Sequence, residues 1–199
     1  MIYPVVVYGH TVLRKRSREI PDNIQGLEEF IGNLFETMYA SEGVGLAAPQ
    51  VGQTLRLFVV DATPYAEDEP ELKNFKKVFI NPEIVERSGK IVSFNEGCLS
   101  IPNIREDVNR EETVLIRYQN EKWEWLEEEY NGIASRIIQH EFDHLNGVLF
   151  TDLVSPLRKK LLRGKLRAIS KGNFKASYRT ILPGQKVPEY VGWNDGMTE

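Results

Sequence analysis

Two of the chain's three histidines lie four residues apart in the stretch QHEFDHLNG, which runs from Gln139 to Gly147. Residues four apart on a helix share one face, with their Cβ atoms about 6 Å apart, so His140 and His144 can point at one metal ion. Glu141 is rotated by about 100° from His140 and can instead reach a water molecule on that ion. This is the arrangement of the H-E-x-x-H metal-binding motif. The alternative is a helix face with two incidental histidines, which would need other partners if they were buried.

Cys98, in the stretch EGCLSIP, is the only cysteine of the chain. A single cysteine is most often a small hydrophobic core residue, and it cannot form a disulfide within the chain. Together with the histidine pair, however, it would complete a set of one thiolate and two imidazoles. Three protein ligands leave a fourth tetrahedral position open, which is typical of a catalytic rather than a structural metal site.

The stretch GVGLAAPQ, from Gly43 to Gln50, joins the first long predicted helix to the first strongly predicted strand. Its composition alone favours a turn built from small residues. In a functional interpretation, the two glycines expose backbone groups to a ligand, and the amide of Gln50 donates a hydrogen bond to a developing oxyanion.

Two helices and a series of short strands are predicted to position these residues. Apolar residues at helical spacing predict an amphipathic helix over 23–39 and a second helix over about 133–145, which carries the histidine pair. A basic helix is expected over about 156–170, and the polar stretch 62–74 predicts a surface loop. The predicted fold class is α+β, with short, mostly antiparallel strands around a central metal-binding helix. Stretches rich in β-branched and aromatic residues predict the strands at 55–61, 77–82, 90–94, 113–119 and 122–128.

The bulk composition is that of an ordinary globular domain. With 199 residues, of which 41% are hydrophobic, the chain is long enough for a sizeable core. We expect one catalytic domain over 1–172 and a C-terminal extension over 173–199 that is docked or partly disordered. No apolar run is long enough to span a membrane, and the N-terminus does not resemble a secretion signal. A lone cysteine fits a reducing, cytoplasmic location best.

The net charge of −4 hides an uneven distribution of charge along the chain. Residues 153–188 contain ten Lys or Arg and no Asp or Glu. Such a run is usually a solvated helix face, but it can also seek a polyanion.

Three stretches in this order, GVGLAAPQ, EGCLS and QHEFDHL, resemble the signature motifs of bacterial peptide deformylases. Each stretch is moderately specific on its own, and the three together are highly specific. The resemblance implies a metal-dependent hydrolase that removes the formyl group from the N-terminal formyl-methionine of newly synthesised polypeptides. It also implies one divalent metal ion per chain, held by Cys98, His140 and His144. Fe²⁺ is the usual metal of the family, and Zn²⁺, Ni²⁺ or Co²⁺ can occupy the site.

The resemblance also implies a mechanism. A metal-bound water attacks the formyl carbon, with Glu141 acting first as the general base and then as the general acid. The oxyanion would accept hydrogen bonds from the side-chain amide of Gln50 and from the backbone N–H of Leu99.

The substrate is expected to bind as the family's substrates do. Its backbone would pair with Gly45 like an added strand. Its methionine side chain would enter an apolar pocket lined by Val44, Ile133, Ile137 and the ring of His140.

Three further residues resemble supporting residues of the family. Glu96 and Arg110 resemble an ion pair that steadies the metal loop, and Arg105 resembles a basic residue at the mouth of the site. Asn109 stands where many members carry proline, which leaves the register of the ion pair open. It is equally open whether Arg136, early in the metal helix, faces solvent or narrows the pocket.

The expected partners are formyl-methionyl nascent peptides and, through the basic helix over 156–171, the ribosome. Neither a membrane nor a specific nucleic-acid sequence is expected as a partner.

The alternative function is a zincin-like endopeptidase, which would share the H-E-x-x-H motif. Such enzymes usually take a Glu or His downstream as the third ligand, whereas here no histidine follows His144 and the nearest downstream acidic residue is Asp152. A binding module with a structural metal would need a fourth protein ligand, and His10 is far away in the sequence.

Overall fold

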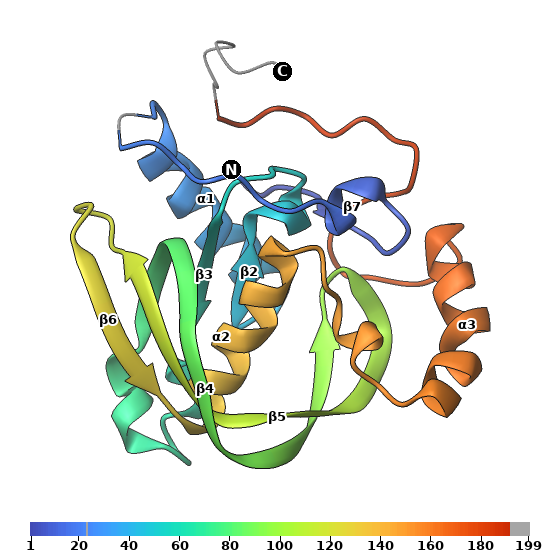
Figure 1. The fold of residues 1–199 in the computed structure, drawn as a ribbon. Helices are drawn as coiled ribbons and strands as arrows, with labels where there is room; N and C mark the ends of the chain where they lie inside the picture. Colours follow the sequence, from blue (N-terminus) through green and yellow to red (C-terminus); the bar gives the residue numbers. More distant parts are fainter. Residues whose placement is uncertain (23, 192–199) are drawn as a thin grey trace.

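The structure is a computed structural model that describes residues 1–22 and 24–191. Within these ranges the chain forms three α-helices and two β-sheets (Figure 1). The helices are α1 (Leu27–Ala40), α2 (Gly132–Leu145) and α3 (Pro156–Ser170). The strands are β1 (Val5–Val6), β2 (Gly45–Ala47), β3 (Leu57–Asp61), β4 (Lys76–Cys98), β5 (Ile101–Gln119), β6 (Trp125–Tyr130) and β7 (Thr180–Ile181).

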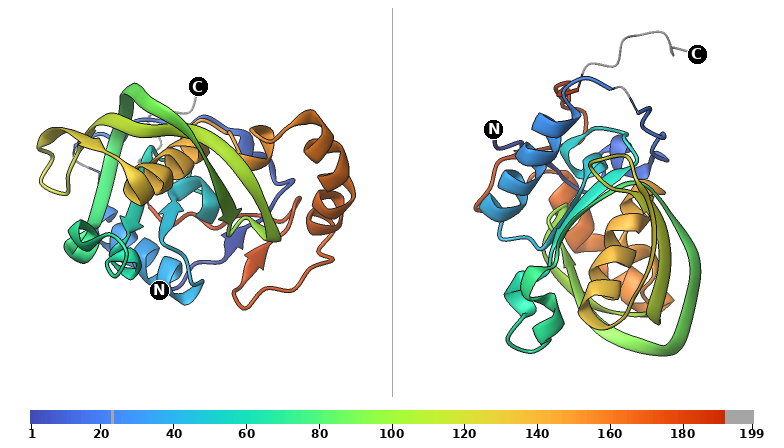
Figure 2. Two further views of the ribbon diagram at one scale, coloured as in Figure 1. Left: turned by 90° about the horizontal axis from the view of Figure 1, so that it is seen from below. Right: turned by 90° about the vertical axis from the view of Figure 1, so that its left-hand side faces the viewer.

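The larger sheet has the order β2-β3-β4-β5-β6, and every neighbouring pair in it is antiparallel. Its long strands β4 and β5 curve around α2, which lies on the concave side of the sheet (Figure 2). The α+β class and the antiparallel pairing are therefore confirmed. The sheet packs its apolar face against the buried side of α2, which includes Ile137, Ile138 and Leu145.

The expectation that all strands are short is wrong for β4 and β5, which span 23 and 19 residues. The segments predicted as separate strands at 77–82 and 90–94 belong to one strand. Asn81 and Gly89 are residue types that favour turns, and both have positive φ values, of 51° and 80°. Each lies at a register shift between β4 and β5, so these residues form bulges that bend the strand rather than turns that end it.

Three other predicted boundaries also differ from the structure. Residues 45–47, within the stretch whose composition favoured a turn, form the edge strand β2 because they pair with β3. The predicted strand at 122–128 begins only at Trp125, since the side chain of Asn120 accepts hydrogen bonds from the backbone N–H groups of Lys122 and Glu124. The predicted loop 62–74 contains two short 3-10 helices.

Local capping interactions set both ends of α2. The helix begins at Gly132, whose φ of 56° lies in the left-handed region that favours glycine. Glu69 accepts a hydrogen bond from the backbone N–H of Ile133, at 3.3 Å. An acceptor at this end satisfies a backbone donor that has no partner within the helix. The helix ends at Leu145, followed by Asn146 and by Gly147 in the left-handed conformation.

The segment after α3 runs back over the N-terminal part of the chain. Strand β7 pairs in parallel with β1, so that Val5 lies opposite Thr180 and Val6 opposite Ile181. Further on, the ring of Tyr190 stacks on that of Tyr3, with centroids 4.0 Å apart. The division of the chain after residue 172 stays a prediction, and residues 192–199 lie outside the described residues. In the described part of the chain, no helix has the length and apolar character needed to cross a membrane.

Candidate metal centre

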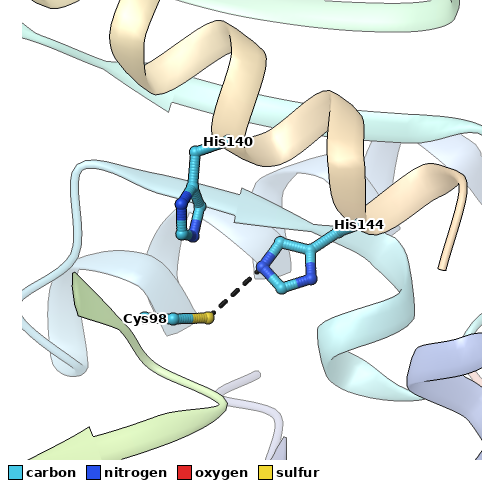
Figure 3. Close-up of side chains that lie close together, drawn as sticks. All are labelled: Cys98, His140 and His144. Carbon is cyan, nitrogen blue, oxygen red and sulfur yellow. Dashed lines mark hydrogen bonds between the residues drawn. The ribbon is translucent and has the colours of Figure 1, made fainter. Parts of the chain in front are cut away.

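Three potential donor atoms converge beside α2 (Figure 3). The sulfur of Cys98 lies 3.3 Å from Nε2 of His144, and the donor atoms of Cys98, His140 and His144 all lie within 4.8 Å of one another. The two imidazole rings are 5.1 Å apart between centroids and inclined by 75°. The four-residue spacing on one helix therefore places both rings beside the same point, which faces the cysteine.

A hairpin brings the cysteine to the helix. Cys98 is the last residue of β4 and pairs with Ile101 at the start of β5, so Leu99 and Ser100 form a two-residue turn. The rest of the hairpin curves around α2 (Figure 1), and the cysteine before this turn reaches His144 of that helix. The long strands thus explain how two distant motifs meet.

The chemistry of this donor group fits a divalent transition metal. One thiolate and two imidazoles suit iron or zinc. Burial lowers the pKa of His144, which favours the neutral imidazole that offers a lone pair to a metal. Two buried atoms at the site, Oε2 of Glu141 and Nδ1 of His144, have no hydrogen-bond partner among the described residues. Buried polar atoms without partners are rare and call for a functional explanation.

Glu96 orients His140 from the side opposite the donor group. Its Oε2 lies 2.9 Å from Nδ1 of His140, which leaves Nε2 of that ring for a metal. Arg110 donates to both oxygens of Glu96, at 2.7 and 3.0 Å, and Arg136 donates to Oε1 at 3.0 Å. Burial opposes the charge on Glu96, but the hydrogen bonds from His140 and Arg110 outweigh it and hold the pKa of Glu96 well below its ordinary value.

The side chain of Glu141 extends from α2 to the edge strand β2, where it lies against Gly45. A Cβ atom on Gly45 would come within 2.6 Å of Oε1 of Glu141, so only glycine lets the strand approach the carboxylate so closely. Burial raises the pKa of Glu141 to about 7. A buried carboxyl group in this position can accept a proton and return it.

Comparison with known proteins identifies the family. The family model of polypeptide deformylase matches residues 2–160. The chain belongs to the peptide deformylase family. A peptide deformylase of Flavobacterium johnsoniae is 50% identical over 193 residues, which cover 94% of this chain and 98% of that relative. That of Christiangramia forsetii is 47% identical, with the same coverage of both chains.

Solved structures of deformylases agree with this assignment. The crystal structure of a peptide deformylase from Legionella pneumophila matches with a TM-score of 0.76 at 36% identity, over 86% of this chain and 96% of that chain. That of Thermotoga maritima matches with a TM-score of 0.71 at 43% identity, over 78% of this chain and 99% of that chain. The resemblance carried by the three motifs is confirmed, and the zincin-like endopeptidase is not favoured.

Gln50 and Leu99, the expected oxyanion donors of the deformylase site, both border the same cavity as Cys98. Nε2 of Gln50 is 3.5 Å from Sγ of Cys98 and 3.4 Å from Oγ of Ser100. Oε1 of the same amide accepts a hydrogen bond from the backbone N–H of Ala47 at 2.8 Å, which fixes the direction of its N–H groups. Leu99 directly follows the sulfur in the hairpin turn.

These residues line one cavity of about 470 Å³ beside the donor group. Ile133 packs in the neighbouring hydrophobic cluster and not along the cavity wall, so its contact with substrate stays a prediction. The other expected substrate-binding residues and most of the catalytic and metal residues border the cavity: Val44, Gly45, Gln50, Cys98, Leu99, Ile137, His140 and Glu141.

The structure answers the question about Arg136. This side chain is buried and does not face solvent, because its guanidinium bonds Glu96 and the carbonyl oxygens of Val92 and Val108, at 2.6 and 3.1 Å. It also borders the cavity. Arg136 is therefore a second cation on Glu96, which the sequence did not indicate.

The other two arginines lie at different depths. Arg110 reaches Glu96 although Asn109 precedes it, and the register places Arg110 opposite Val92. Arg105 borders the cavity at its exposed side and donates to the side-chain and backbone oxygens of Asn95, at 3.0 and 2.6 Å. The position of Arg105 agrees with a residue at the mouth of the site, and its role there stays a prediction.

Sequence reasoning missed the contribution of the C-terminal segment to the cavity. Residues 175–178 form part of its wall, and the hydroxyl of Tyr178 donates a hydrogen bond to the carbonyl oxygen of Leu99 at 2.7 Å. The segment has few apolar residues at any regular spacing, so no periodic signal marks it. The aromatic residues Phe174 and Tyr178 in an otherwise polar stretch are the one local feature that marks this segment.

Proposed function

We propose that this chain is a metal-dependent deformylase in which Cys98, His140 and His144 hold the metal and Glu141 carries the proton. Its reaction is hydrolysis of the formyl group from formyl-methionyl peptides. The observation that carries the proposal is the convergence of three donor atoms within 4.8 Å beside a buried carboxylate oxygen that has no partner among the described residues.

One Fe²⁺ ion per chain is the metal that we propose, and the same donors also suit Zn²⁺, Ni²⁺ or Co²⁺. When bound, a divalent ion acts as a Lewis acid that makes water available as a nucleophile near neutral pH. The protein's own part is to hold the donor atoms in place, and Glu96 does this for His140 through its 2.9 Å contact with Nδ1.

The remaining residues act on the proton and on the developing negative charge. Glu141 takes the proton of the attacking water and returns it to the leaving amine. The Gln50 amide and the Leu99 backbone N–H donate to the formyl oxygen as it gains charge. A donor of this kind lowers the activation barrier by about 3 kcal/mol in an acyl-transfer site. The hydrogen bond between Oε1 of Gln50 and the N–H of Ala47 supports this role, because it keeps the amide N–H groups aimed at the turn that contains Cys98 and Leu99.

The substrate path follows from the sheet order. Strand β2 is at the edge of the five-stranded sheet, and its Gly45 borders the cavity, so an extended peptide can add to β2 as a further strand. The methionine side chain would then enter the apolar part of the cavity near Val44 and Ile137, with Ile133 behind them. An unbranched thioether fits such a pocket because it adapts to an irregular wall.

The test is formate release from formyl-Met-Ala-Ser, with the metal content measured in parallel on protein that was purified without oxygen. We expect Glu141→Ala to keep the metal and lose turnover, and Cys98→Ala to lose the metal itself. No formate from an iron- or nickel-loaded sample would overturn the proposed reaction. Full metal occupancy in Cys98→Ala would refute Cys98 as a ligand.

We further propose that α3 brings the enzyme to the ribosome, in the cytoplasm, where nascent chains emerge. Three apolar residues of α3, Leu162, Leu166 and Ile169, are buried against the body. The opposite face carries a row of basic side chains, and it exposes Leu157 and Leu161 by 67% and 60%. The basic side chains of this face suit an anionic RNA surface, and the exposed leucines can make apolar contacts with the same partner.

A further inference from the structure

The C-terminal segment 175–191 contacts both parts of the chain that carry the expected oxyanion donors. One of these parts is the hairpin turn after Cys98, which contains Leu99. The other is the 3-10 helix Ala48–Val51, which contains Gln50. The described segment therefore connects two elements that must keep a fixed distance from each other.

At the hairpin turn, the contact is the 2.7 Å hydrogen bond from the hydroxyl of Tyr178 to the carbonyl oxygen of Leu99. The neighbouring residue Ser100 is held separately, since its carbonyl oxygen accepts from the backbone N–H of Tyr8 at 2.8 Å and its hydroxyl lies 3.4 Å from the amide of Gln50. The Leu99 carbonyl lies outside the ladder that pairs β4 with β5, because pairing ends at Cys98 and Ile101. Tyr178 thus supplies to this carbonyl a partner that the hairpin does not.

At the second element, the segment packs against the end of the 3-10 helix. Gly52, which follows this helix, has a φ of 86°, and a Cβ atom there would come within 2.0 Å of the side chain of Val187. The next residue, Gln53, donates from its side-chain amide to the carbonyl oxygen of Pro188 at 2.8 Å. The segment therefore packs against the residues that directly follow the 3-10 helix of Gln50.

Further contacts along its length hold the segment in place. Strand β7 pairs with β1, and Nε2 of His10 lies 3.1 Å from the carbonyl oxygen of Gln185. Asn103 donates to the carbonyl oxygen of Lys175 at 2.9 Å, just before Tyr178. With anchors on both sides, Tyr178 cannot move far without breaking backbone contacts.

We infer that Tyr178 is a positioning residue for deformylation: by holding the carbonyl oxygen of Leu99 it restrains the backbone torsions of that residue, and so the direction in which the Leu99 N–H points toward the formyl oxygen. This rests on the proposed function, in which that N–H is an oxyanion donor. The family model ends at residue 160, so Tyr178 lies outside the part of the chain that it matches. Burial, and then the negative charge of Cys98, raises the pKa of Tyr178 to about 12, so its hydroxyl remains a donor at neutral pH.

The test compares Tyr178→Phe with Tyr190→Phe in the full-length, metal-loaded enzyme. Both changes remove one hydroxyl from a tyrosine of the same segment and keep the ring, but Tyr190 is at the other end of the segment and stacks on Tyr3. A displacement of about 1 Å at a reacting centre can reduce a rate about 100-fold. Because the turn keeps its other contacts, we expect a loss of about 10-fold in kcat for Tyr178→Phe, with KM and metal content unchanged. Tyr190→Phe should match the wild type.

Two further measurements separate positioning from other roles. The affinity for a peptide phosphonate, a tetrahedral mimic of the oxyanion, should fall about as much as kcat, whereas the affinity for the product peptide should not change. Amide hydrogen exchange at Leu99 and Ser100 should become faster in Tyr178→Phe only. An unchanged kcat would overturn the inference, and so would a raised KM at constant kcat or a loss of metal.

The exchange measurement also keeps this inference apart from the proposed function. If the wild-type enzyme releases no formate, the proposed function fails, and with it the catalytic meaning of the Leu99 N–H. If the wild type is active and exchange at Leu99 is the same in Tyr178→Phe, only the role of Tyr178 fails.

Discussion

Gly45 shows how one missing side chain sets the geometry of the centre. Because a Cβ atom there would lie 2.6 Å from Oε1 and 2.8 Å from Cγ of Glu141, Gly45→Ala must push the carboxylate away from its place. We expect kcat to fall by about 100-fold or more while the metal stays bound, since none of the three donors moves. Steady-state formate release and metal analysis of the same preparation check this.

Gly32→Ala is the matched control for this change. Gly32 is an exposed residue in the middle of α1, and a Cβ atom there meets nothing within 4 Å. Replacing an unhindered helix glycine by alanine stabilises a protein by about 0.5–1 kcal/mol. Gly32→Ala should therefore raise the unfolding free energy and leave kcat unchanged. If Gly45→Ala were as active as this control, the close approach to Glu141 would have no role in catalysis.

Arg136 offers a prediction about stability. Arg136→Met would leave the carbonyl oxygens of Val92 and Val108 without this donor and remove one of the two arginines on buried Glu96. Breaking one partner out of a buried ionic network costs about 3–5 kcal/mol, and the lower figure applies here because Arg110 remains on Glu96. Urea unfolding followed by circular dichroism measures the difference.

Lys90→Met provides the comparison for Arg136→Met. Lys90 also pairs with a carboxylate, that of Glu112 at 3.4 Å, but its side chain is 74% exposed. Exposed ion pairs contribute about 0–1 kcal/mol, so this variant should unfold close to the wild type. Equal losses in the two variants would show that burial of the Arg136 network adds nothing to stability.

The residues of the proposed metal site could be predicted from the sequence, because their types and spacing are local properties. Two histidines four residues apart on one helix lie on the same face whatever surrounds them, and the glutamate that follows the first lies beside that face. Arg136 and Tyr178 could not be assigned in this way. Their roles depend on Glu96 and Leu99, which are distant in the sequence and come close only after the hairpin has curved around α2.

At the scale of elements, the sequence predicted helices better than strands. The apolar face of α2 has a helical period that tertiary contacts only reinforce. The bulges at Asn81 and Gly89 use the same residue types as true turns, so local chemistry alone cannot tell a bent strand from two short ones. Only the partner strand decides between them, because β5 continues past both bulges.

One cluster ties three strands together and predicts a pH dependence. Lys77 of β4 and Tyr118 of β5 donate to Glu128 of β6, at 2.8 and 2.5 Å, and Tyr130 donates to it as well. Burial opposes the charge on Glu128, but the hydrogen bonds from Lys77 and the two tyrosines outweigh it and hold its pKa below the ordinary value of 4.5.

A carboxylate with a lowered pKa in the folded state stabilises the protein above its unfolded pKa, and this contribution is lost as the pH falls. Glu128→Gln should therefore be less stable than the wild type at neutral pH, by about 1 kcal/mol or less because Glu128 is partly exposed. The difference should shrink as the pH falls below about 4.5. Urea unfolding at pH 7, 5 and 3.5 measures it, and a difference that is constant over this range would contradict the assignment.

At the scale of the molecule, the C-terminal segment changes how the role of α3 has to be tested. Removing residues 156–199 would delete the basic helix, but it would also delete Tyr178 and β7, which pairs with β1. A truncated enzyme could then lose activity for reasons unrelated to any partner. Charge changes on the exposed face of α3 avoid this problem.

The variant that tests α3 changes Lys159, Lys160 and Arg163 to Glu together. All three are exposed, whereas Arg158 is kept because it pairs with Glu106 at 2.5 Å and so joins α3 to β5. We expect this variant to lose co-sedimentation with ribosomes and to keep formate release from formyl-Met-Ala-Ser. For the wild type, the logarithm of the binding constant should fall linearly with the logarithm of the salt concentration. The variant should reduce that slope by roughly two to three, about one unit for each lost phosphate contact.

A control with the same change in net charge separates a docking face from general attraction to RNA. Lys73, Lys90 and Lys122 are also exposed and lie outside α3, so changing these three to Glu alters the total charge equally. If α3 is the docking face, this control should bind ribosomes almost as well as the wild type. Equal loss of binding in the two variants would mean that only net charge matters, and salt-independent binding of the wild type would exclude an electrostatic contact with ribosomal RNA.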